Sequence, residues 1–80
     1  MSQRIDPTWR VLESYSTHDG LRCVDLFERP DATFGFERFR RDPEDLGIWT
    51  ALGNDSAIIF SDVESARREA ARLSPDIFDR

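Results

Sequence analysis

The sequence contains no lysine, and it has one cysteine and one histidine, Cys23 and His18. A lone cysteine excludes an internal disulfide, and one cysteine with one histidine fits no structural zinc pattern. No apolar run approaches the roughly 18 residues that a membrane-spanning helix needs, and residues 1–4 lack an apolar signal region. We therefore predict a cytoplasmic protein that holds neither metal nor cofactor and does not enter a membrane.

Catalytic signatures are missing as well. The chain has neither a G-x-x-x-x-G-K phosphate loop nor a G-x-G-x-x-G fingerprint. His18 stands in a predicted turn, which is typical of a solvated side chain, because sequence adjacency to Asp19 does not build a catalytic triad. Cys23 lies in a predicted strand and is interpreted as a small buried hydrophobe. We predict that the protein is not an enzyme and has no small-molecule substrate.

Size and charge narrow the class of protein further. The chain has 80 residues, of which 39% are hydrophobic and 34% charged, with a formal net charge of -5. This length supports one domain and one core. An acidic chain repels nucleic-acid phosphates unless its arginines are clustered, so a nucleic-acid partner is disfavoured.

The pattern predicts an α+β fold, an antiparallel meander of three to five strands followed by one C-terminal helix. We expect the sheet over residues 5–60, the helix over 61–73 and a tail over 74–80. The strands are expected at 9–17, 21–29 and 34–41, with shorter ones at 48–52 and 57–60. The pair Asp19-Gly20 predicts a tight hairpin turn with positive φ at both residues. Ser61 with Glu64 predicts a capping box at the start of the helix.

The strand register decides which side chains share a face. We expect a four-residue loop over 30–33, which pairs Phe27 with Phe36 and Asp25 with Arg38. This register sorts the apolar side chains into two faces. The first face collects Val11, Tyr15, Val24, Leu26 and Phe39, and the second collects Leu12, Cys23, Phe27, Phe34 and Phe36.

The helix carries a narrow stripe of Val63, Ala66, Ala70 and Leu73, with Arg67, Arg68 and Arg72 expected to face solvent. This stripe can cover only one face of the sheet, so the second face would expose several aromatic rings. Fold-back of the last strands or the tail, a second copy of the chain, or another protein could cover it. We predict a homodimer or another protein partner, with Leu12, Phe27, Phe34 and Phe36 as the candidate interface.

Two other groups of residues suggest alternatives. Arg38, Arg40 and Arg41 form a short basic patch that is a candidate anion or partner contact. The string F-G-F-x-x-F over 34–39 resembles part of the aromatic octamer of RNA-recognition motifs, which implies single-strand RNA binding through Phe34 and Phe36. The helix that this fold requires between its first two strands has no room here.

Residues 21–45 resemble a family of short bacterial proteins that share a core of the form F-x-R-P-D-G-T-F-G-F-E-x-F-R-R-D-P-E-D and have no assigned function. Trp49 and the helix over 61–73 also fit this family. The resemblance implies the sheet-plus-helix outline and no activity. Ala32 stands where the family has glycine, which we interpret as evidence against a positive φ at that position.

The function predicted from these features is that of a small accessory protein that acts by protein–protein contact. The alternative is a small acidic inhibitor or nucleic-acid mimic, comparable to an anti-CRISPR protein. That alternative requires carboxylates that gather on one face. Its residues are Asp31, Asp42, Glu44, Asp45, Asp55, Asp76 and Asp79.

Overall fold

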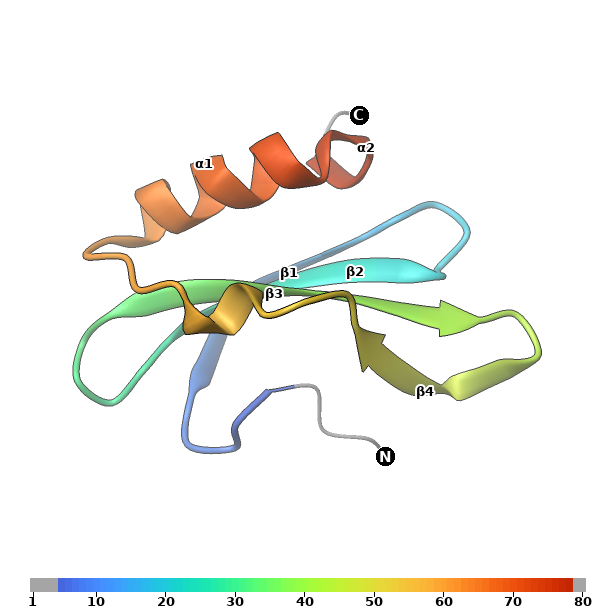
Figure 1. The fold of residues 1–80 in the computed structure, drawn as a ribbon, viewed down its shortest axis with the longest axis horizontal. Coiled ribbons are helices and arrows are strands. Elements are labelled where there is room, and N and C mark those ends of the chain that lie inside the picture. Colours follow the sequence, from blue (N-terminus) through green and yellow to red (C-terminus); the bar gives the residue numbers. More distant parts are fainter. Residues whose placement is uncertain (1–4, 79–80) are drawn as a thin grey trace.

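A computed structural model of the chain describes residues 5–78. Four antiparallel strands form one sheet in the order β1-β2-β3-β4. They are β1 (Arg10–Ser16), β2 (Arg22–Glu28), β3 (Phe34–Asp42) and β4 (Asp45–Ala51). A 3-10 turn η1 (Asp55–Ala57) and the helices α1 (Val63–Leu73) and α2 (Pro75–Phe78) follow. Both helices lie on one side of the sheet (Figure 1), which confirms the predicted α+β meander.

The predicted fifth strand over 57–60 is reduced to a single bridge between Phe34 and Phe60. The hairpin between β1 and β2 also differs from the prediction. Gly20 has a φ of 73°, but Asp19 does not share a positive φ. The amide of Gly20 donates to the carbonyl of Thr17, and the amide of Thr17 donates to the carbonyl of Arg22. This turn is longer than the two-residue primed turn and needs only one left-handed residue.

The link between β2 and β3 contains the residue that sets the register. Ala32 has a φ of 68°, the only positive φ of a non-glycine residue among those the structure describes. Its amide donates to the carbonyl of Arg29, and the amide of Arg29 donates to the carbonyl of Thr33. A turn followed by one left-handed residue is the usual three-residue hairpin loop. The expectation that Ala32 avoids a positive φ was therefore wrong, and so was the four-residue loop.

The shorter loop moves the register by one residue. Leu26 lies opposite Phe36, and Phe27 lies opposite Gly35. A one-residue slip sends every side chain of a strand to the other face. Phe27 and Phe36 therefore lie on opposite faces of the sheet, whereas the sequence prediction placed them together.

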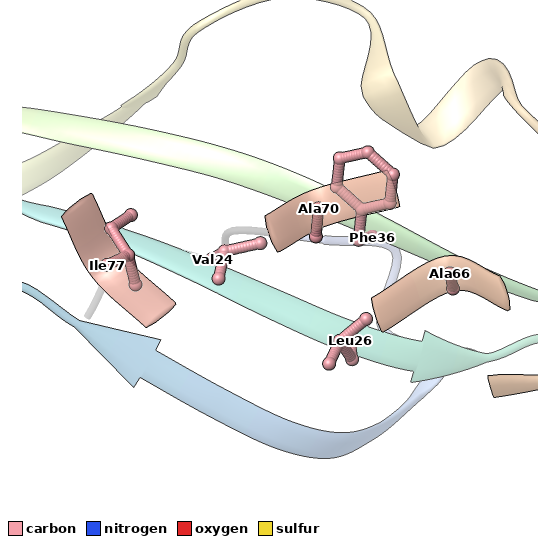
Figure 2. Close-up of a cluster of buried hydrophobic side chains, with 6 residues drawn as sticks. All are labelled: Val24, Leu26, Phe36, Ala66, Ala70 and Ile77. Carbon is pink, nitrogen blue, oxygen red and sulfur yellow. The ribbon is translucent and has the colours of Figure 1, made fainter. Parts of the chain in front are cut away.

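The helix side of the sheet carries the main core. Figure 2 shows Val24, Leu26 and Phe36 of the sheet with residues of both helices beside them. The helical members of this cluster are Ala66, Ala70 and Ile77. Because alanine is small, α1 packs close to the strands, as its predicted stripe implied. The tail also contributes, since Ile77 is buried and the ring of Phe78 lies 4.6 Å from that of Tyr15.

Two local details of the core differ from the prediction. A bulge at Leu12 places Val11 opposite Phe27 and Glu13 opposite Leu26, so Val11 and Tyr15 do not share a face. The helix is capped one residue later than predicted. Its N-cap is Asp62, whose side chain accepts from the amide of Ser65.

Arg67 does not project freely from the helix into solvent, as the sequence prediction had it. Its guanidinium contacts the carboxylate of Glu13 on β1, with Nη2 2.5 Å from Oε2. Tyr15 donates its hydroxyl to the same carboxylate at 2.6 Å. These contacts fasten α1 to the sheet beside the apolar core.

Candidate protein-contact surface

The face of the sheet away from the helices is covered at Phe27 by the chain itself. Trp9 stacks on Phe27 with ring centroids 4.6 Å apart and an interplanar angle of 18°. The guanidinium of Arg29 lies 5.0 Å from the ring of Trp9 and 5.1 Å from that of Phe27. Trp9 was predicted to belong to the first strand. It instead precedes β1, after a turn in which its amide donates to the carbonyl of Asp6.

The four side chains of the predicted aromatic interface do not gather on one exposed face. Phe27 and Phe36 are fully buried, and they lie on opposite faces of the sheet. Phe34 is half-buried against the helix-side core, and Leu12 is half-buried at the bulge of β1. Phe27 and Phe36 were expected to need a partner, but the chain itself covers both. Neither the stacking of Trp9 nor the one-residue register shift was foreseen.

The F-G-F string has a packing explanation. A β-carbon on Gly35 would lie 2.8 Å from Nη2 of Arg29 and 3.0 Å from the ring of Phe27. Only glycine allows the ring and the guanidinium to lie this close to the backbone of β3. Phe36, on the other face, is buried in the core beside α1 and presents no ring to a nucleotide base.

The three arginines of the predicted basic patch have separate partners within the chain. Arg38 binds Asp55, with Nε 2.9 Å from Oδ2, and not Asp25 as predicted. Arg40 pairs with Asp42 at 3.2 Å. Arg41 donates to the carbonyl of Gly20, and its guanidinium lies 4.4 Å from the ring of Trp49.

The described carboxylates of the inhibitor alternative are spread over the molecule. Asp55 is buried, and Asp76 on α2 pairs with Arg22 at 2.9 Å. Asp31 lies in the link before β3, and Asp42 is the last residue of that strand. Glu44 is exposed in the turn after β3, whereas the side chain of Asp45 and the whole of Asp79 lie outside what the structure describes. This distribution counts against a nucleic-acid mimic, which requires charges gathered on one face.

The segment that follows β4 is the feature that sequence reasoning missed. Residues 52–59, called here the strap, run along the part of β3 that β4 does not cover (Figure 1). The amide of Leu52 donates to the carbonyl of Arg38 at 2.9 Å. The amide of Arg38 donates to Oδ2 of Asp55, and that of Ser56 donates to Oε1 of Glu37.

Arg29 fixes the far end of the strap. Its Nη2 donates to the carbonyls of Ser56 and Ile58, at 2.6 and 3.2 Å. Its Nη1 donates to the carbonyl of Phe34 at 2.9 Å. The same guanidinium therefore covers Phe27 on one face and holds the strap against the edge of β3.

The strap buries a charged side chain and exposes aliphatic ones, the reverse of the usual arrangement. Its carboxylate, Asp55, points inward and is buried, while its large aliphatic side chains are exposed. Leu52 and Ile58 are each 41% exposed, and Ile59 is 66% exposed. These three residues are called here the strap surface. Ile48, on the adjacent strand β4, is 55% exposed.

Aliphatic exposure is concentrated in this one part of the chain. Val11 on β1 is the remaining exposed large hydrophobic residue among those described. Single exposed aliphatic residues are ordinary, whereas several in one stretch make that stretch a candidate contact surface. Sequence reasoning did not predict this surface. Residues 57–60 were predicted as a strand, and the strap has no regular hydrophobic period that would indicate otherwise.

Cys23 is buried, His18 is exposed in its turn, and no group of three or more potential metal ligands occurs within residues 5–78. In the same range, no helix has the length and apolar character to span a bilayer. Comparison of the chain with protein-family models, with curated proteins and with solved structures finds no match.

Proposed function

We propose that the protein acts by protein–protein contact, without catalysis, and that its first partner is a second copy of the same chain bound through the strap surface. The observation that carries this proposal is the outward exposure of Leu52, Ile58 and Ile59 on a segment whose carboxylate is turned inward. Burial of aliphatic area contributes about 25 cal/mol per Å². The strap surface gains this stabilising free energy only when a partner covers it.

A second copy is the occupant that the chemistry of the surface favours. Aliphatic side chains need no particular polar partner, so the strap surface is complementary to itself. A two-fold dimer uses the same patch on both subunits, which is the commonest arrangement among soluble oligomers. The net charge of -5 opposes association, and salt reduces this repulsion.

Sedimentation equilibrium over a concentration series tests the proposal. We expect the average mass to rise from the 9.3 kDa of one chain toward twice that value, and to rise at lower protein concentration when salt is added. The double variant Ile58→Asp, Ile59→Asp should remain a monomer. Val11→Asp is the matched control, because Val11 is also exposed but lies on β1, and it should associate as the wild type does. A wild-type mass of one chain at every concentration would contradict the proposal.

The place of action belongs to the same proposal. Cys23 is buried and is the only cysteine in the sequence, which suits a reducing compartment. Together with the absence of a disulfide framework, this supports the cytoplasm as the location that we propose.

A further inference from the structure

The strap is held almost entirely by polar contacts. The carbonyl and amide of Ser56 bind Arg29 and Glu37, respectively. The carboxylate of Asp55 binds Arg38. No residue of the strap belongs to the hydrophobic core cluster or to the half-buried side chains packed against it. Polar contacts at a surface contribute modestly to stability because water competes for the same groups. The strap therefore lacks the apolar burial that holds the rest of the fold.

Arg38 and Asp55 form the strongest of these contacts. One carboxylate accepts from the backbone amide of Arg38 at 3.2 Å, from its Nε at 2.9 Å and from its Nη2 at 3.2 Å. The hydrogen bonds that Arg38 donates to Asp55 raise the pKa of Arg38, so the guanidinium stays charged. Asp55 thus fills the position that a neighbouring strand would occupy, where it satisfies the edge of β3 with a side chain instead of a backbone carbonyl.

The segment has defined limits on both sides. It begins after Ala51, which pairs with Phe39 in the sheet. It ends before Phe60, whose amide and carbonyl bond to Phe34 and whose ring packs against Phe36. A movement of the residues between these anchors leaves the strand pairing and the core between the sheet and α1 unchanged, because neither includes a strap residue.

We propose that the strap, residues 52–59, is a latch that opens as a separate unit while the sheet and α1 remain folded. The contact that holds it closed is that of Asp55 with the three donor groups of Arg38. Opening uncovers the amide and carbonyl of Arg38 on the edge of β3. The inference goes beyond the proposed self-association and does not depend on it, because it concerns a motion within one chain.

Native-state hydrogen exchange followed by NMR, at a concentration where the chain is monomeric, tests the latch. The reporters are the amides of Arg38, Leu52 and Ser56, whose acceptors are Asp55, Arg38 and Glu37. We expect them to exchange at least ten-fold faster than the amides of β2, and to show little dependence on low urea, because latch opening exposes little surface. Equal rates, or a urea dependence as steep as that of β2, would overturn the proposal.

Asp55→Asn tests the fastening itself. This variant keeps the shape of the side chain and removes its charge, and we expect strap exchange to accelerate by about ten-fold or more while β2 amides change far less. Asp42→Asn is the matched control, because it removes one carboxylate from an exposed pair with Arg40 and should leave strap exchange unchanged. Equal acceleration of strap and β2 amides in Asp55→Asn would contradict the role of Asp55. If this variant does not fold, the wild-type urea series alone decides the proposal.

Discussion

The ring of Phe27 lies so close to the backbone of Gly35 that a β-carbon there would be 3.0 Å from two of its carbon atoms. The two residues are direct partners across β2 and β3. Trp9 stacks on the Phe27 ring, and the guanidinium of Arg29 lies close to both rings. This arrangement covers Phe27 on the sheet face that lies away from the helices.

Gly35→Ala tests that close approach. The added methyl group forces Phe27 and Arg29 to shift, and we expect the free energy of unfolding to fall by about 1–3 kcal/mol, the usual effect of overpacking. Urea unfolding measures this change. Gly47→Ala is the control, because a β-carbon there meets nothing within 4 Å, and its stability should equal or exceed that of the wild type. An unchanged midpoint for Gly35→Ala would contradict the packing described here.

Ala32→Gly should stabilise the protein. Ala32 has a φ of 68°, a conformation that costs a non-glycine residue about 1–2 kcal/mol. Glycine removes that strain but gives the unfolded chain more freedom, worth about 0.4–1 kcal/mol, so we expect a net gain near 0.5–1 kcal/mol. In Ala51→Gly, where φ is not positive, the same replacement should lower stability. A loss of stability in Ala32→Gly would show that the residue is unstrained.

The carboxylate of Glu13 makes stability depend on pH. Its hydrogen bond from Arg67, and then that from Tyr15, lower the pKa of Glu13 from its ordinary 4.5. The stabilisation is therefore present above pH 4.5 and is lost as the pH falls through the lower pKa of the folded state. Because the side chain of Glu13 is 34% exposed, we expect a contribution below about 1 kcal/mol.

Glu13→Gln measures this contribution. Thermal unfolding of wild type and variant should differ at pH 7, and the difference should shrink as the pH is lowered below 4.5. Glu44→Gln, which removes an exposed carboxylate from the turn between β3 and β4, controls for the change in net charge. A difference between wild type and Glu13→Gln that stays constant down to pH 3 would contradict the assigned contact.

The sequence predicted the strands and the helix well, but it did not predict correctly which side chains share a face of the sheet. Alternating strands and the Ala66–Ala70 spacing predict the meander and the helix because their periods are regular. The register depends on the positive φ of one residue, Ala32. Because alanine rarely adopts a positive φ, the sequence favoured a longer loop without it. Because a one-residue slip exchanges the faces, that error, together with the unforeseen stacking of Trp9 on Phe27, led to the predicted aromatic interface.

The strap surface had no comparable signal. Residues 52–59 follow neither a helical nor a strand period, and their placement depends on Arg29, Glu37 and Arg38, which are distant in sequence. Asp55 was grouped with the surface carboxylates, although it is buried against Arg38. Contacts of this kind come from tertiary structure, which local sequence patterns do not encode.

The most direct test of the proposed contact is a dilution series followed by two-dimensional amide NMR. The account predicts that the amide signals of Leu52, Ile58 and Ile59 shift with concentration, while those of Phe27 and Phe36 stay fixed. Shifts confined to β1 and β2, or none over the whole series, would contradict the strap surface as the place where two chains meet.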